Sequence, residues 1–378
     1  MKITQVEAIP IKQPQAIQLI NDSAQDGIII KVYTDEGIIG YGEVDSAPSV
    51  IKAIIDAPIS HRICQGLGQA LIGEDPFEID KIWEKMYLAS TFYGRRGAVI
   101  HAMSGIDIAL WDILGKALNK PIYKLLGGEF RNSIRAYASI LMPYTAEECY
   151  TTTRRLCDQG YTAIKLGWGG FEQEMRESIA LVEAARIAAG ENVDLMFDIG
   201  FIPSTDNPVD AASRILLGKE IEQYRPYWLE EPLYPDDLDG YRKMAEALDT
   251  RIACGENETT RYGFRQLIET AKVDVVQPDV TRCGGLSEAK KIANLAQAYH
   301  VTCVPHCWSS GIVEAASLHL VAAIQNGCFL EYCVAETPIR KEIAEELIVK
   351  NGYAQVPQKP GLGIEIDEEA IRRYSYTC

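Results

Sequence analysis

The sequence predicts a (β/α)8 barrel of the modified TIM type with an N-terminal α+β capping domain that the C-terminal segment completes. Two observations support this fold: the 378-residue length exceeds one ordinary domain, and after Arg131 short apolar runs alternate with amphipathic segments. We expect residues 1–130 to form the capping domain, 131–350 the barrel, and 351–378 the segment that returns to the capping domain.

The N-terminal part carries the pattern of an antiparallel sheet followed by helices. Ile28–Val44 contains two apolar, β-branched runs joined by Thr34–Gly37, which is typical of a β-hairpin. From Asp75 to Leu125 apolar residues recur at helical spacing before a pair of glycines, which predicts amphipathic helices. Together these segments predict an α+β unit.

The remaining chain is expected to form eight βα units. Helical segments such as Glu172–Gly190 and Ser287–His300 are amphipathic and can cover the outside of a sheet. Eight parallel strands imply a closed barrel, whereas a doubly wound sheet would carry a phosphate-binding glycine loop that this sequence lacks. The predicted strands are Ile134–Ser139, Ala163–Gly167, Asp194–Asp198, Tyr227–Glu230, Ile252–Glu256, Val273–Gln277, Thr302–His306 and Phe329–Glu331.

Charge and composition point to a small-molecule partner. The formal charge of −16 opposes attraction to nucleic acid or to an anionic membrane surface, because either polyanion would meet a repulsive field. Apolar residues make up 47% of the chain and charged residues 24%, as in folded globular proteins. An anionic substrate would therefore need a bound cation or well-placed basic side chains.

The sequence also indicates a cytoplasmic protein with reduced thiols. The N-terminus lacks the apolar core of a signal peptide, and no apolar stretch approaches the roughly 20 residues of a membrane span. The ten cysteines are scattered and lack the paired spacing of a zinc site. We therefore expect neither export nor a membrane partner.

Polar side chains close the predicted strands. In a (β/α)8 barrel, catalytic groups project from the C-terminal ends of the strands, so these side chains should converge at one mouth. Each strand after the first supplies such a group, and together they are Lys165, Asp198, Glu230 with Glu231, Glu256, Asp279, His306 and Glu331.

Three of these carboxylates predict a metal site. Asp198, Glu230 and Glu256 stand on consecutive strands, where their oxygens could form a site suited to Mg²⁺. A divalent cation would remove their mutual repulsion and could bind a substrate carboxylate. Glu231 follows Glu230 directly, and neighbouring strand residues face opposite ways, so one of the pair must point out of the barrel interior.

Six short motifs occur in the order and at the spacing that a barrel requires. They are SGIDIALWDILGK at Ser104–Lys116, LLGG at Leu125–Gly128, WLEEP at Trp228–Pro232, CGEN at Cys254–Asn257, QPD followed by CGG at Gln277–Gly285, and PHCW at Pro305–Trp308. Together they resemble the mandelate racemase subgroup of the enolase superfamily. The resemblance covers nearly the whole chain, because the first two motifs are similar to the end of that family's capping domain.

The resemblance implies one Mg²⁺ per subunit, held by Asp198, Glu230 and Glu256, in a homo-oligomer. It also implies that Lys165 is a base, because AIKLGWG aligns this lysine with the second lysine of the family's Lys-x-Lys motif. Ala163 replaces the first lysine. This departure removes a positive neighbour that would help to lower the pKa of Lys165.

Further roles follow from the same resemblance. Asp279 and His306 are similar to the subgroup's dyad, in which the aspartate orients the imidazole and raises its basicity. Glu331 resembles the family's hydrogen-bond donor to the substrate carboxylate, which implies a protonated side chain with a raised pKa. Gly200 stands where the family often has asparagine, so one contact to a substrate hydroxyl is missing.

The implied reaction removes the proton next to a carboxylate and forms an enediolate, and a lysine or histidine base working with Mg²⁺ is the known chemistry of this superfamily. We expect water to be eliminated from an acid sugar, an aldonate or aldarate, to give a 2-keto-3-deoxy acid. Racemisation, epimerisation and lactone cycloisomerisation would use the same groups and stay open. The polar cap segments and strand ends suggest the substrate contacts Asp22, Arg96, Trp168, Arg282 and Trp308.

Three alternative functions come from other classes of protein. A Schiff-base aldolase also places a lysine at a strand end but needs no carboxylate trio. A carboxylate-pair glycosidase leaves Lys165 and the Asp279–His306 pair without roles. A catalytically inactive barrel that serves for binding or assembly fits the departures at Ala163 and Gly200, although both candidate bases are present.

Overall fold

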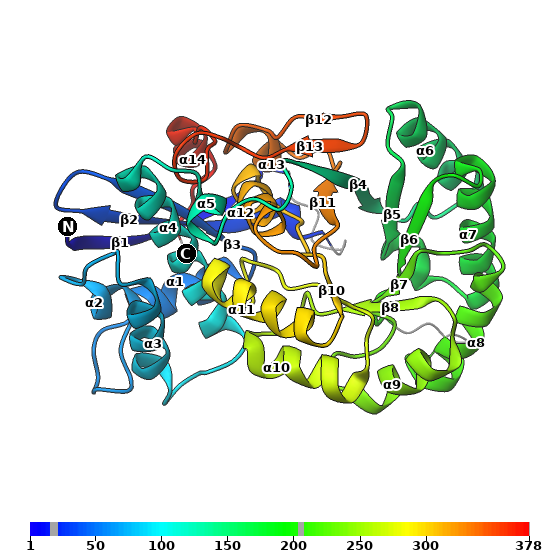
Figure 1. The fold of residues 1–378 in the computed structure, drawn as a ribbon, viewed down its shortest axis with the longest axis horizontal. Helices are drawn as coiled ribbons and strands as arrows, with labels where there is room; N and C mark the ends of the chain where they lie inside the picture. Colours follow the sequence, from blue (N-terminus) through cyan, green and yellow to red (C-terminus); the bar gives the residue numbers. More distant parts are fainter. Residues whose placement is uncertain (16–21, 203–207, 378) are drawn as a thin grey trace.

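The computed structural model describes residues 1–15, 22–202 and 208–377 of the chain. An α+β domain built from the N-terminal residues lies beside a barrel of parallel strands (Figure 1). The expected combination of a capping domain and a (β/α)8 barrel is confirmed.

The capping domain contains a three-stranded antiparallel sheet. Strands β1 (Ile3–Lys12), β2 (Asp26–Thr34) and β3 (Ile39–Val44) pair in the order β1-β2-β3. The turn between β2 and β3 contains Gly37, whose φ of 79° lies in the left-handed region that glycine adopts without strain. The predicted hairpin is therefore confirmed.

The helices of the capping domain pack against this sheet. The predicted helical region contains α3 (Ile79–Ser90), α4 (Ala98–Leu118) and α5 (Ile122–Leu125). Two helices that the sequence analysis did not identify, α1 (Pro48–Asp56) and α2 (Leu67–Leu71), precede them. Helix α4 is long and apolar enough to cross a membrane, contrary to the expectation that no stretch approaches that length, but most of it is buried inside the fold.

Strand β3 and helix α4 approach each other closely at two glycines. A Cβ at Gly42 would lie 1.9 Å from the backbone oxygen of Gly105, and one at Gly40 would lie 2.1 Å from that of Ala109. These helix atoms are backbone and cannot move aside independently. Glycine at both positions is therefore what lets the helix pack directly on the strand.

The barrel strands run parallel in sequence order from β4 to β10, and β11 pairs with β4 on its other side. All eight predicted strands are present in the described residues, with boundaries shifted by a few positions. They are β4 (Ser133–Leu141), β5 (Ala163–Gly167), β6 (Asp194–Asp198), β7 (Trp228–Glu230), β8 (Arg251–Cys254), β9 (Val275–Val276), β10 (Thr302–Cys303) and β11 (Phe329–Cys333).

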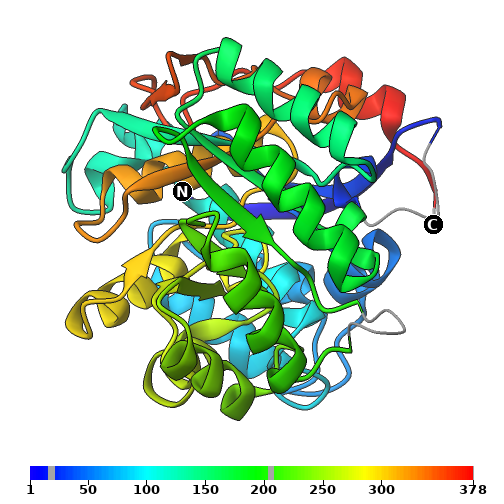
Figure 2. The same ribbon diagram turned by 90° about the vertical axis from the view of Figure 1, so that its right-hand side faces the viewer.

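Helices cover the outside of these strands (Figures 1 and 2). They are α6 (Ala146–Asp158), α7 (Met175–Ala189), α8 (Ala211–Glu222), α9 (Leu238–Ala247), α10 (Thr260–Gln266), α11 (Gly285–Ala298) and α12 (Gly311–Ala322). After β11 the chain forms the short helix α13 (Pro338–Glu342). The chain then forms a hairpin of β12 (Val349–Lys350) and β13 (Tyr353–Gln355), and β13 pairs antiparallel with β4.

The C-terminal segment therefore contacts the barrel before it reaches the capping domain. Beyond the hairpin, the backbone of Gly361 exchanges hydrogen bonds with the turn that leads into α5. Helix α14 (Glu368–Tyr374) then lies near β1, and Glu368 accepts hydrogen bonds from Lys31 and Tyr41 of the sheet. These contacts attach the end of the chain to the capping domain.

Helix α4 also fixes the capping domain to the barrel. The carboxylate of Asp107 accepts hydrogen bonds from the backbone N–H (2.9 Å) and the hydroxyl (2.6 Å) of Ser287 on α11. The hydroxyl of Ser287 also accepts one from the Trp111 indole. Burial raises the pKa of Asp107 to about 7, despite the opposing hydrogen bonds from Ser287.

The close packing of β3 on α4 predicts that Gly42→Ala lowers the free energy of unfolding by about 3 kcal/mol, because the new methyl group collides with helix backbone. Gly27→Ala is the matched control in the same sheet, since its methyl group would meet only one atom, at 3.8 Å. Urea unfolding of both variants tests this. Equal stability of the two variants would contradict the packing argument.

The raised pKa of Asp107 predicts a specific pH dependence of stability. Between pH 4 and 7 the folded state retains a proton that the unfolded chain releases, so the free energy of unfolding falls as pH rises. In Asp107→Asn, which cannot titrate, this fall should be smaller by about 3 kcal/mol. Urea unfolding at several pH values measures both slopes, and parallel slopes would show that Asp107 does not carry the effect.

Candidate active site

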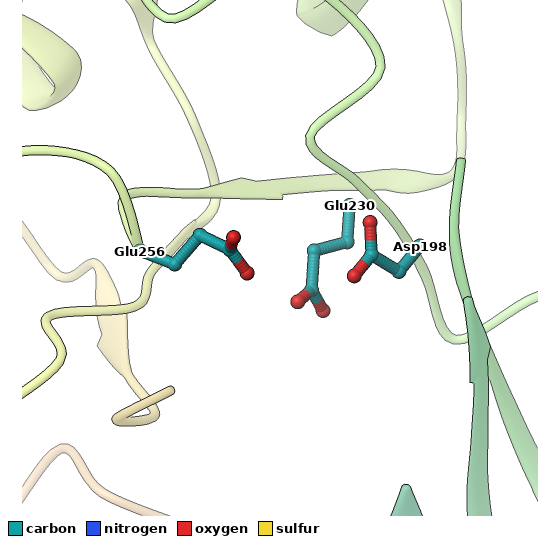
Figure 3. A group of neighbouring side chains, drawn as sticks. All are labelled: Asp198, Glu230 and Glu256. Atoms are coloured by element: carbon teal, nitrogen blue, oxygen red, sulfur yellow. The ribbon is translucent and has the colours of Figure 1, made fainter. Parts of the chain in front are cut away.

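Three carboxylates from consecutive barrel strands meet at the mouth. Asp198 ends β6, Glu230 ends β7, and Glu256 follows β8. One oxygen from each lies within 4.8 Å of the others, and all three residues are buried. Figure 3 shows the three side chains directed into one common space. The structure therefore brings together the three carboxylates that were predicted to hold a metal ion.

This carboxylate trio fits a divalent cation. Burial, and then the neighbouring Glu230, raise the pKa of Asp198 well above its usual range, because concentrated negative charge disfavours ionisation. Oxygen Oδ1 of Asp198 is buried and has no hydrogen-bond partner among the described residues. An all-oxygen donor set with an unpartnered buried oxygen is suited to a hard cation such as Mg²⁺.

The neighbouring glutamates face different surroundings, as the alternation of a strand requires. Glu230 points into the barrel, where it accepts hydrogen bonds from the Trp228 indole (2.8 Å) and from Lys165. Glu231 instead accepts a hydrogen bond from the backbone N–H of Gly255 at 2.7 Å. Thus only the first glutamate of the pair belongs to the trio.

Lys165 projects from β5 into the same cluster. Its Nζ lies 2.5 Å from Glu230 Oε1, 2.7 Å from Glu331 Oε1 and 3.7 Å from Asp198 Oδ2. Burial by itself lowers the pKa of Lys165, but the surrounding carboxylates raise it well above its usual value. This agrees with the loss of the first lysine at Ala163, because three carboxylates and the phenol of Tyr137 now surround Lys165.

His306 and Asp279 form the predicted dyad. His306 Nδ1 lies 2.7 Å from Asp279 Oδ2, and the other oxygen of Asp279 accepts hydrogen bonds from the backbone and hydroxyl of Thr281. Nε2 of the imidazole is 3.3 Å from Glu256 Oε2. Burial lowers the pKa of His306, but Glu256, Glu331 and Asp279 together raise it to about 10.

Glu331 lies between the two candidate bases, and its contacts bear on its charge state. Oε1 accepts a hydrogen bond from Ser139 and pairs with Lys165, and Oε2 accepts one from the backbone N–H of Cys307. Burial favours a raised pKa, yet Lys165 and His306 lower it below its usual value. These contacts favour an ionised Glu331, because the side chain receives hydrogen bonds and faces positive charge, and its protonation in the reaction stays a prediction.

Two glycines shape the strand ends around the trio. A Cβ at Gly167 would lie 2.6 Å from the Cβ of Asp198, so glycine lets that carboxylate lie flat against β5. Gly200, where the family often has asparagine, has a φ of 65°, and a Cβ there would lie 3.0 Å from the Trp168 ring. In this chain, the indole of Trp168 takes the space that a side chain at position 200 would use.

A cavity of about 330 Å³ opens beside these groups. Of the predicted substrate contacts, Asp22, Trp168, Arg282 and Trp308 line it. Its lining residues are Asp22, Ser139, Ile140, Leu141, Lys165, Gly167, Trp168, Asp198, Phe201, Glu256, Asn257, Arg282, His306 and Trp308.

Arg96 is not among the residues that line this cavity. Its guanidinium lies over the ring of Tyr262, 5.5 Å from the ring centroid, and donates to the backbone oxygen of Arg95. The structure therefore does not bring Arg96 to the site, because the turn before α4 directs it to α10 instead.

The sequence analysis missed residues that support the site from a distance. Asp45, just after β3 of the capping domain, accepts two hydrogen bonds from Arg282, at 3.0 Å to its backbone oxygen and 2.5 Å to its carboxylate. Arg282 in turn reaches the backbone oxygen of Glu256 at 3.5 Å. No local pattern identifies Asp45, whereas Ser139, at the end of the first predicted strand, followed the same rule that found the other site residues.

Comparison with known proteins shows full-length similarity. Residues 1–127 match the mandelate racemase / muconate lactonizing enzyme N-terminal domain, and residues 148–370 match the enolase C-terminal domain-like family. D-xylonate dehydratase of Haloferax volcanii is 33% identical over 92% of this chain and 85% of that protein. D-galactarolactone cycloisomerase of Agrobacterium fabrum is 33% identical over 92% of this chain and 90% of that protein. The crystal structure of 3,6-anhydro-D-galactonate cycloisomerase from Zobellia galactanivorans superimposes with a TM-score of 0.89 at 32% identity and covers 100% of both chains.

The carboxylate trio predicts that Asp198→Asn weakens Mg²⁺ binding by about 100-fold, because it removes one charged ligand and leaves two. Isothermal titration calorimetry with Mg²⁺ measures the affinity. Glu231→Gln is the matched control, since its carboxylate lies outside the trio and should leave binding within about threefold of the wild type. Unchanged binding in Asp198→Asn would place the cation elsewhere.

Proposed function

Because this chain belongs to the mandelate racemase / muconate lactonizing enzyme family of the enolase superfamily, we propose that it is a Mg²⁺-dependent acid-sugar dehydratase. The observation that carries the proposal is the placement of two candidate bases on one carboxylate trio beside one cavity. Lys165 contacts Glu230, the middle carboxylate of the trio, and His306 contacts Glu256. Two proton-transfer groups are what an elimination of water requires.

Asp198, Glu230 and Glu256 would hold the cation. When bound, it would neutralise the trio, favour a neutral Lys165, and stabilise the negative charge that develops on a substrate carboxylate. Asp279 keeps Nδ1 of His306 engaged, so that Nε2 is the nitrogen available to the cavity. The residues thus divide into a binding group and a proton-transfer group.

The reaction then needs two proton transfers. One base removes the α-proton of the acid sugar and leaves an enediolate, and the other base gives a proton to the β-hydroxyl, which departs as water. The resulting enol ketonises to a 2-keto-3-deoxy acid. Atoms and charge balance without an oxidant or reductant.

Cycloisomerisation of a sugar lactone or anhydro sugar is the second candidate. It is favoured by the similarity to two cycloisomerases, one of which covers the whole chain at a TM-score of 0.89. The same bases would act, but the leaving group would be a ring oxygen. Racemisation and epimerisation use the same first proton transfer. Cytoplasmic location and homo-oligomeric assembly stay predictions.

A screen with Mg²⁺ and a set of acid sugars tests the proposal. Semicarbazide detects 2-keto acids, and NMR in D₂O detects exchange of the α-proton. We expect both signals from one stereochemical series, with loss in EDTA and recovery on adding Mg²⁺. Exchange without a keto acid would instead indicate a racemase or epimerase, and neither signal from any acid would favour an inactive barrel. A cycloisomerase would give the keto acid only from a lactone or anhydro sugar, because expulsion of the ring oxygen forms the same enol.

His306→Asn and Lys165→Met should each lower dehydration at least about 1,000-fold, because each removes one proton-transfer group. A variant that still exchanges the α-proton in D₂O has kept the residue that acts first. Both variants should still bind Mg²⁺, since neither residue belongs to the trio. Full activity in either variant would contradict its assigned role.

A further inference from the structure

The described side chains that could attract an anion in the cavity are already paired with protein carboxylates. Lys165 lies between Glu230 and Glu331. Arg282 pairs with Asp45 at 2.5 Å. The cavity therefore offers a single place for a substrate carboxylate, which is the cation that the trio would hold.

The outer part of the cavity is apolar. Leu141, Trp168, Phe201 and Trp308 each follow a catalytic residue or its strand partner toward the C-terminal mouth, so they lie outward of the reacting groups. Trp168 and Phe201 pack edge to face with ring centroids 5.2 Å apart. Aromatic and aliphatic walls can pack against the C–H groups of a sugar chain, but they provide no hydrogen-bond donor or positive charge for a carboxylate.

Asp22 adds negative charge to this outer part. It comes from the capping domain, is half-buried and lines the cavity. Its Oδ1 accepts hydrogen bonds from the Trp308 indole at 2.9 Å and from the backbone N–H of Ala24 at 3.0 Å. These bonds fix the carboxylate at the cavity wall, where it can accept hydrogen bonds from substrate hydroxyl groups and repels a second anion.

From this arrangement we infer that the site accepts monocarboxylic acid sugars (aldonates) and rejects the dicarboxylic acid sugars (aldarates) of the same configuration. The inference rests on the proposed function. The distal carboxylate of an aldarate would be desolvated against aromatic rings, without a cation among the described lining residues, and would face Asp22. A distal hydroxyl meets neither penalty. Asp22 is thus a specificity-determining residue.

The test compares stereochemically matched pairs, for example gluconate with glucarate, galactonate with galactarate, and xylonate with xylarate, using the full chain with Mg²⁺. We expect kcat/KM for the preferred aldonate to exceed that for its aldarate by about 100-fold or more. Asp22→Asn keeps an oxygen that can accept from Trp308 but loses the charge. It should narrow this ratio by about tenfold, chiefly by lowering KM for the aldarate.

Asp26→Asn is the matched control, because it removes the same charge from the same part of the capping domain, at a residue that does not line the cavity. Its ratio should stay within about threefold of the wild type. Circular dichroism and melting temperature show whether each variant is folded. If Asp22→Asn does not fold, the wild-type ratio alone decides the inference.

The outcomes separate this inference from the proposed function. Aldarates used as well as aldonates, or a ratio unchanged in folded Asp22→Asn, would overturn the inference while α-proton exchange still supports the proposed function. Exchange with no acid of either class would overturn both.

Discussion

The mutual repulsion of buried carboxylates at the barrel mouth is the constraint on which the rest of the site depends. Asp198, Glu230, Glu256 and Glu331 are all buried within reach of one another's charge. Removing such groups from water costs far more than an isolated interaction returns, so they persist only with compensating charge and hydrogen-bond donors. The positions of Lys165, the indole of Trp228 and the backbone N–H of Cys307 follow from that need.

The capping domain also holds part of the barrel mouth in place. The buried carboxylate of Glu43, from β3, accepts hydrogen bonds from Ser309, Ser310 and Val313 at the start of α12. This places negative charge at a helix N-terminus, where it is stabilised. The loop between His306 and α12 is therefore held from the capping domain, which explains why the two parts must pack against each other to complete the site.

Charge also explains how the proposed site would capture one carboxylate and reject a second. Among the described residues that line the cavity, Lys165 and Arg282 pair with the protein's own carboxylates, so a bound divalent cation would attract the substrate. Net charge of −16 then acts as a background that disfavours any further negative group. Selectivity of this kind arises because the second carboxylate of the rejected ligand would find no positively charged partner, and not because the accepted ligand makes additional contacts.

The sequence by itself determined the barrel strands and the residues that end them. Strands can be predicted locally, from the periodicity of apolar residues. Because catalytic groups in a barrel stand at the C-terminal ends of strands, the predicted strands also indicated Asp198, Lys165 and His306. Only the tertiary structure decided that Asp45 and Glu43 support the site and that Arg96 turns away. It also placed the charges that raise the pKa of Lys165 and lower that of Glu331. All of these features depend on contacts between segments that are distant in sequence, such as the contact of Arg282 with Asp45. A local sequence pattern cannot predict them, because it does not show which distant charges will be buried together.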